Sequence, residues 1–281
     1  MIDTLIAFGC SNTFGAESID DFDHNNPDNI NHSYAKYLSD SLQCKNYYNL
    51  AQNGLSNFEI TRRIFKELPD IIKKHDAEKI FVIVGWTDYN RLRLYLKHII
   101  PFKEAFRQII DICEYPLLCK FFPKQFKPID TEVMRDIGFD VDTVIKQYPF
   151  MEQFLLGVMN YLFRTPSFYI MNTYAKLAAE NYLLKENLKF LTLPTLRSHT
   201  ISGTILNHLD PERDKTFINS EKILNKKNNI FEHDEEGVYK FSALESFKQY
   251  GISKSGGHLR AAAHEELAKY LYSEIKDRGI L

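Results

Sequence analysis

The chain has 281 residues, of which 44% are hydrophobic and 26% are charged, and its formal net charge is −2. A chain of this length can bury a core without disulfides or metal ions. Its balanced charge offers no basic surface for a phosphate backbone, so we expect no nucleic-acid partner.

The cysteines show neither a CxxC pair nor metal-finger spacing, so we expect free thiols, no metal and no cofactor (Cys10, Cys44, Cys113 and Cys119). The N-terminus lacks the features of a signal peptide, and no run approaches the ~18–20 apolar residues needed to cross a bilayer. We therefore expect a cytoplasmic protein with no membrane span.

The first half of the chain predicts a strand–helix alternation. Residues 4–8 form a short apolar run that predicts a buried strand, and a helix follows over 34–42. A short strand is expected at 47–50, and Ser56 can cap a helix that runs to about residue 74. Residues 79–84 are β-branched and nearly continuous, which is typical of a strand buried on both faces.

The second half is less regular. Residues 90–170 are rich in aromatic residues and cut by prolines, and we interpret them as a helical insertion or lid on a single domain, 1–281. A helix is expected over 171–186, a strand over 188–193 and a last helix over about 259–276. Strands alternating with helices predict an α/β protein with a three-layer α/β/α, flavodoxin-like parallel sheet.

Ligands of such sheets bind at the carboxyl ends of the strands, and polar segments follow three of the predicted strands here. Ser11 follows the first strand and can present a hydroxyl nucleophile, which then requires a base. Position alone favours a capping role for Ser11 or Asn12 over a catalytic one. The base candidate is His258, at the start of the last helix, although its position alone favours a partly exposed surface histidine.

Two further segments are candidates for binding substrate. Gly54 lies in a turn after the second strand, where a glycine lets a backbone amide approach a ligand or simply forms the turn. Residues 85–91 follow the strongest strand and hold the only tryptophan, Trp86, with several polar side chains. This loop is expected to line the site.

Taken together, these segments resemble the blocks of the SGNH (GDSL-type) hydrolase family, in the same order. The family's first block is similar to Gly9-Cys10-Ser11-Asn12, with Cys10 where the family usually has aspartate. Its next block resembles residues 49–54, its third resembles Gly85-Trp86-Thr87-Asp88, and its last resembles Ser255-Gly256-Gly257-His258. The segments 32–38 and 261–271 also resemble the family's first and last helices.

The resemblance implies a site in which His258 activates Ser11 and the amides of Ser11 and Gly54 stabilise an oxyanion. Thr87 stands where the family has an oxyanion-hole asparagine, and Asn90 is a candidate substitute from the same loop. Asn12 and Trp86 are further candidates for substrate contact.

The orienting acid of the histidine is the second departure from the family. Ser255 occupies the position of the family's aspartate. Asp88, or an acid within 232–236, is a candidate replacement. Losing such a carboxylate slows a triad by about 10⁴-fold.

We therefore expect a serine ester hydrolase for a small acyl ester such as an acetylated carbohydrate or a lipid. The alternatives are an SGNH-fold binding or assembly protein with little or no activity, and an acyltransferase that uses the same residues. The acidic loop around residues 20–28 fails the calcium-loop pattern, and no phosphate loop or Gly-x-Ser-x-Gly elbow is present.

Overall fold

The computed structural model describes residues 1–21, 23–87, 91–95, 109–113, 146, 151–157, 166–195, 227–230, 241–254 and 257–281. Its central feature is a four-stranded parallel sheet in the order β2-β1-β3-β6. These strands are β1 (Thr4–Gly9), β2 (Asn46–Asn49), β3 (Ile80–Trp86) and β6 (Lys189–Pro194). A parallel bridge between Thr192 and Asn229 extends the β6 edge.

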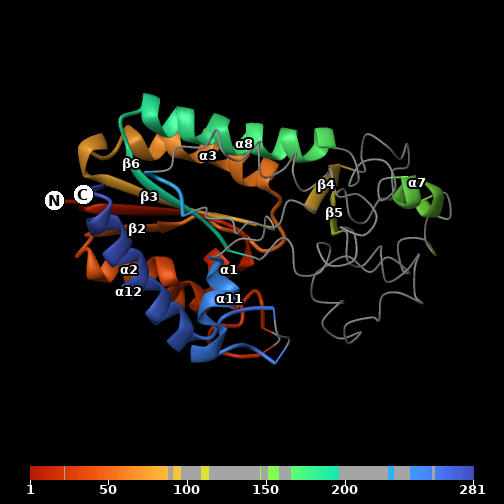
Figure 1. Ribbon diagram of the computed structural model, residues 1–281, viewed down its shortest axis with the longest axis horizontal. Helices are drawn as coiled ribbons and strands as arrows, with labels where there is room; N and C mark the ends of the chain where they lie inside the picture. The colour runs from red at the N-terminus through yellow and green to blue at the C-terminus, as the bar shows by residue number, and fades with distance from the viewer. Residues whose placement is uncertain are drawn as a thin grey trace.

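Helices cover both faces of this sheet (Figure 1). On one face lie α2 (Tyr34–Ser41) and α12 (Ala261–Asp277), and on the other lie α3 (Asn57–Ile72) and α8 (Pro166–Lys185). The three-layer α/β/α arrangement is therefore the one that the alternation of strands and helices predicts.

Alternate residues of the strands enter two separate cores. Leu5 and Ala7 of β1 pack with the α2 and α12 side, whereas Ile6 and Phe8 pack with the α3 and α8 side. All four are fully buried, as expected when every strand is covered on both faces. The predicted cap is confirmed, because the Ser56 hydroxyl accepts from the amide of Glu59 at the start of α3.

The region predicted to be a helical insertion, 90–170, contains strands as well as helix. β4 (Arg91–Tyr95) and β5 (Ile109–Cys113) pair in an antiparallel sheet, and α7 (Met151–Gly157) and the start of α8 follow. The sequence Arg-Leu-Arg-Leu-Tyr of β4 has the period of two of a strand, which the aromatic and proline content of the region had obscured. A purely helical insertion is thus wrong for these stretches, while a single domain and a lid stay predictions.

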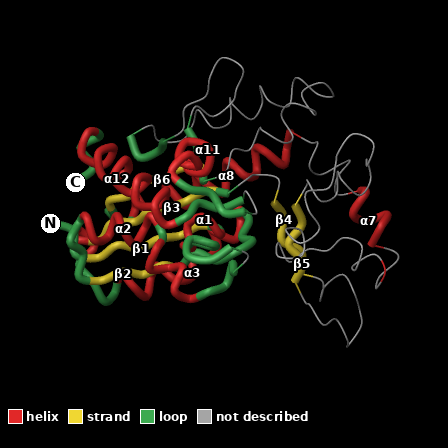
Figure 2. Tube along the Cα trace, turned by 90° about the horizontal axis from the view of Figure 1, so that it is seen from below, coloured by secondary structure: helices red, strands yellow, loops and turns green. Residues whose placement is uncertain are grey.

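These elements lie beyond the carboxyl ends of the main strands, opposite the chain's N-terminus (Figures 1 and 2). α8 starts at Pro166, five residues before the predicted helix, and proline suits the first position of a helix. A short helix, α11 (Ala243–Phe247), packs against α12. Within the described ranges, no helix combines the length and apolar character required to traverse a bilayer.

Candidate active site

Ser11 begins α1 (Ser11–Phe14), a single helical turn that follows β1 with only Cys10 between them. The amides of Thr13 and Phe14 both donate to the Cys10 carbonyl, which fixes the turn at the strand's carboxyl end. Gly15 ends it with a φ of 90°, a conformation that favours glycine. The predicted nucleophile thus lies at the carboxyl edge of the sheet, on a rigid turn.

Two glycines allow this turn to sit close against the strand ends. Gly9 and Gly85 are register partners on β1 and β3. An ideal Cβ added to either one would lie 2.1 Å from the Thr13 Oγ1 atom. That hydroxyl also hydrogen-bonds the Tyr34 hydroxyl at 2.9 Å. The glycine pair therefore forms a notch that receives Thr13, and it sets the height of Ser11 above the sheet.

His258 lies beside Ser11, although the two are 247 positions apart in the chain. The His258 Nε2 atom is 2.9 Å from Ser11 Oγ. Just before α12, an antiparallel bridge between Ile252 and Leu259 closes the segment that carries the histidine. Its backbone carbonyl also accepts from the Ser253 amide at 2.9 Å. The structure thus brings together the two predicted catalytic residues within hydrogen-bond distance.

A third residue, Glu17, completes the arrangement. Its Oε2 atom is 2.7 Å from His258 Nδ1, and its side chain is fully buried. A carboxylate only accepts hydrogen bonds, so Nδ1 carries the proton and donates it. In a neutral imidazole Nε2 then accepts, and the Ser11 hydroxyl donates. The three groups are connected as serine, histidine and acid.

Glu17 is a candidate functional residue that the sequence patterns do not reveal. The orienting group of the histidine was expected to be Ser255, Asp88 or an acid within 232–236, and all of these lie outside the described residues, as does Asn90. The structure instead supplies the acid from the loop just after the nucleophile, 241 positions before the histidine. This loop holds several other carboxylates, and no local pattern distinguishes Glu17 from them.

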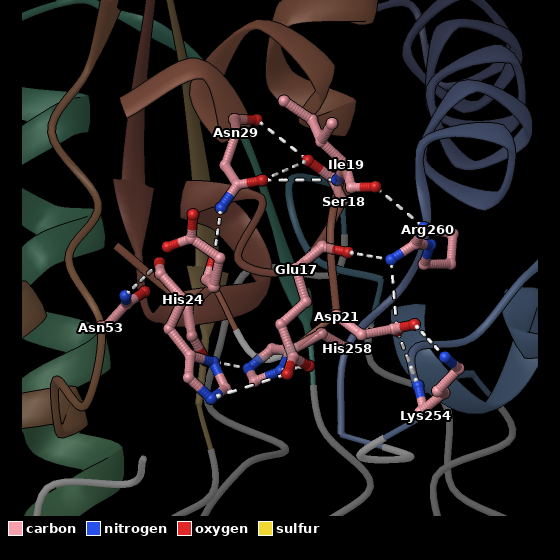
Figure 3. A network of polar contacts seen from close by, with 12 residues as sticks. Glu17, Ser18, Ile19, Asp21, His24, Asn29, Asn53, Lys254, His258 and Arg260 are labelled. Atoms are coloured by element: carbon pink, nitrogen blue, oxygen red, sulfur yellow. Dashed lines mark hydrogen bonds and ion pairs between the residues drawn. The ribbon is translucent and has the colours of Figure 1, made fainter. Parts of the chain in front are cut away.

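Arg260 joins the loop of the acid to the segment of the histidine (Figure 3). Its guanidinium donates to the carbonyls of Glu17 and Ile19, at 3.2 and 2.8 Å, and to Asp21 Oδ1 at 3.2 Å. The Lys254 amide donates to the same Asp21 oxygen at 2.9 Å. A guanidinium presents five donors in a rigid fork, so one side chain can hold several acceptors at once. Arg260 thereby fixes Glu17 relative to His258.

Replacing Arg260 with methionine is expected to lower kcat about tenfold to a hundredfold, because a misplacement of about 1 Å at a catalytic group costs up to about 10²-fold. The aliphatic replacement keeps much of the side-chain volume and removes the donors. Steady-state kinetics on an activated aryl ester would measure the effect. The matched control is Arg278→Met, since Arg278 binds Glu274 and the Asn229 carbonyl near the far end of the same helix. Equal losses in the two variants would contradict a positioning role.

The predicted oxyanion donor Gly54 lies in the turn that follows β2. The amides of Leu50 and Gln52 donate to the carbonyls of Ala7 and Gly9, at 2.8 and 3.1 Å, so this segment runs alongside β1 up to the start of the site. Gly54 then adopts a φ of 77°, which an L side chain rarely takes. The Asn53 amide group donates to the His24 carbonyl at 2.6 Å, which ties this turn to the loop of Glu17.

Two of the residues predicted to contact substrate, Asn12 and Thr87, are buried. Each has side-chain polar atoms without a hydrogen-bond partner in the described part of the chain. These atoms are both side-chain amide atoms of Asn12 and the hydroxyl of Thr87. The side chain of Asn57 holds the backbone of Thr87. Its Oδ1 atom accepts from the Thr87 amide at 3.0 Å, and its Nδ2 atom donates to the Thr87 carbonyl at 3.2 Å. Buried polar groups usually have partners, so both residues suit contact with a bound ligand.

Trp86 is placed differently from its prediction. It ends β3, is 1% exposed and belongs to the core on the α3 and α8 side. Successive side chains of β3 point to opposite faces of the sheet, and that of Trp86 points into this core, where it packs. Only its indole N–H, which is without a partner among the described residues, remains a candidate for substrate contact.

His264, on α12, does not share the role of His258. It is fully buried, and its ring stacks on Tyr34 with centroids 6.0 Å apart. Burial, with a smaller contribution from His258, lowers the pKa of His264 to about 3. His264 is consequently a neutral packing residue at physiological pH.

Similarity to known proteins is found among solved structures. No family model matches the sequence, and no curated protein matches it. The chain is similar to TesA, at 11% identity and a TM-score of 0.47, over 98% of this chain and 99% of TesA. It is also similar to a psychrotrophic esterase, EstA, from Pseudoalteromonas sp., at 10% identity and a TM-score of 0.44, over 98% and 97% of the two chains.

A third similar structure is the lipase Lip_vut3 from a goat rumen metagenome, at 9% identity and a TM-score of 0.44, over 97% of both chains. At such identities these likenesses carry no argument about activity. The α/β/α fold expected from the SGNH resemblance is the fold of this chain.

Proposed function

We propose that the protein is an SGNH-type serine ester hydrolase that acts on a small acyl ester. The observation that supports this most is the alignment of Ser11, His258 and Glu17, joined by contacts of 2.9 and 2.7 Å. A nucleophile, a base and a group that orients the base are what hydrolysis through an acyl-enzyme requires. Their convergence at the carboxyl edge of a parallel sheet agrees with where such folds bind ligands.

In the proposed reaction, Ser11 Oγ attacks the acyl carbonyl while His258 Nε2 takes the hydroxyl proton. Glu17 stabilises the imidazolium that forms, without accepting its proton. His258 then gives that proton to the departing alcohol oxygen, which leaves an acyl-serine. Water, deprotonated by the same histidine, attacks the acyl-serine and releases the acid.

The oxyanion is expected to be held by the backbone amides of Ser11 and Gly54. Thr87 can add a hydroxyl donor, since its Oγ1 atom is buried and has no partner among the described residues. Asn90 stays a candidate for the same role. One such donor is worth about 10²–10³ in rate where it has been measured.

The substrate we propose is an acetylated carbohydrate or a lipid ester, as the family resemblance implies. The contact between Glu17 and His258 favours hydrolysis over the alternative of an inactive binding protein. That alternative arose in part because Ser255 stands where the family has an orienting aspartate, and Glu17 can take the role of that aspartate. Acyl transfer would use the same residues and differ only in the acceptor.

A fluorophosphonate probe that reacts with activated serines tests the proposal. We expect the folded protein to be labelled at Ser11, and Ser11→Ala to abolish labelling and hydrolysis of an aryl ester. Ser18→Ala is a suitable control, since Ser18 is another buried serine of the same region and bonds Asn29. A folded protein that the probe leaves unlabelled would overturn the proposal. Product formed preferentially with an added alcohol would identify a transferase.

A further inference from the structure

A second histidine lies against the acid of the candidate triad. His24 Nε2 is 3.6 Å from Glu17 Oε1, the carboxylate oxygen that does not face His258 in the triad contact. The rings of His24 and His258 are 5.0 Å apart between centroids and inclined by 71°. Figure 3 shows the three side chains pointing toward one another.

We propose that Glu17, His24 and His258 form a zinc-binding site and that zinc reversibly switches the active site off. This inference rests on the proposed hydrolase function for its effect, but not for the binding itself. Two imidazoles and one carboxylate are a ligand set that Zn²⁺ uses in proteins. One ligand atom from each of the three residues lies within 4.8 Å of the others.

The ligand atoms of the three residues, the two histidines included, lie within 4.8 Å of one another, so shifts of about 1.5 Å or less bring them to tetrahedral spacing. Tetrahedral ligands at the usual Zn–N and Zn–O distances lie about 3.3 Å apart. The contact between Glu17 and His258 would open from 2.7 Å, and the contact between Glu17 and His24 would close from 3.6 Å. All three side chains are largely buried, so protein rather than bulk water surrounds most of the site. A water molecule can take the fourth position.

Metal binding at this point would remove the base that the reaction needs. Zinc takes the lone pair of His258 Nδ1, and the proton displaced from that nitrogen moves through solvent to Nε2. The remaining N–H of the neutral ring then resides on Nε2. An Nε2 atom that carries a proton cannot accept the proton of Ser11, so nucleophilic attack stops until the metal leaves.

The binding test uses the Ser11→Ala protein, so that it does not depend on catalysis. Zinc affinity is measured by competition with a chelating dye, and the shift in melting temperature at saturating zinc is recorded. His24→Gln is expected to weaken binding at least about tenfold and to remove most of the thermal shift. The matched control is His32→Gln, because His32 bonds Tyr37 and is not one of the three proposed ligands. Thiol ligation is controlled with Cys44→Ser.

The functional arm uses the unmodified protein and the fluorophosphonate probe. Zinc is expected to slow labelling of Ser11, and a chelator is expected to restore the metal-free rate. The proposal is overturned if zinc does not bind, or if His24→Gln binds zinc as tightly as its parent. In that case His24 only supports the Glu17 carboxylate. Labelling of the metal-free protein reports separately on the proposed hydrolase function.

Discussion

Replacing Glu17 with glutamine is expected to lower kcat about 10⁴-fold while the fold stays intact, as loss of the orienting carboxylate does in serine triads. The amide is nearly isosteric with the carboxylate, so packing is preserved. Its NH₂ group can donate to His258 Nδ1, however, and this favours the tautomer whose Nε2 carries the proton. It also removes the negative charge that stabilises the imidazolium. Steady-state kinetics on an activated aryl ester, with circular dichroism as a check on folding, would measure the loss.

A double-variant comparison sharpens this test. Groups that act as one unit show strongly non-additive losses, so Glu17→Gln in a Ser11→Ala background is expected to cause almost no further loss. Glu274→Gln is the matched control, because Glu274 is a salt-bridged glutamate near the far end of α12. An unchanged kcat in Glu17→Gln would show that another acid orients His258. Asp88 and the acids within 232–236 would then be the next candidates.

Replacing Gly85 with alanine is expected to destabilise the protein by about 1–3 kcal/mol or more, the usual cost of overpacking a core. An ideal Cβ at this position would lie 2.1 Å from Thr13 Oγ1, 2.6 Å from Thr195 Cγ2 and 2.7 Å from the Tyr34 hydroxyl. These atoms belong to separate segments of the chain, α1, α2 and the residue after β6, so relieving one contact leaves the others. The displaced Thr13 would also move α1, and with it Ser11.

Thermal and urea unfolding would measure the change, and for a chain of this size each kcal/mol is expected to shift Tm by roughly 2–4 °C. Gly157→Ala is the matched control, since a Cβ there meets no atom of the described residues within 4 Å. If Gly85→Ala unfolds at the temperature of the control, the glycine notch does not set the position of α1. We further expect slower probe labelling of Gly85→Ala under conditions where it remains folded.

The main sheet and its helices were predictable because their signals are local. The buried run before Gly9, the β-branched run of β3 and the Ser56 cap each depend on a few neighbouring residues. The order of the SGNH-like blocks also placed Ser11 and His258 at the same edge of the sheet. The antiparallel pair β4 and β5 was missed, since aromatic content and prolines masked the alternation in β4.

The position of Glu17 could not have been predicted in the same way. The family resemblance puts the orienting aspartate at position 255, three residues before His258, whereas the acid that contacts His258 is separated from it by 241 positions. The φ of 90° at Gly15 and of 59° at Glu17 accompany the change of chain direction after α1. The contacts of Arg260 then hold the returning loop in place. None of these features has a pattern within its own segment.

The sequence by itself determined the layered α/β architecture and the pair of residues that face each other across the site. Hydrophobic periodicity decides which faces are buried, and the carboxyl ends of parallel strands necessarily meet at one edge. Only the tertiary structure decided which carboxylate accompanies His258 and which second histidine adjoins it. A buried charge is tolerated only where partners converge on it, and that convergence is made by packing between distant segments rather than by any one of them.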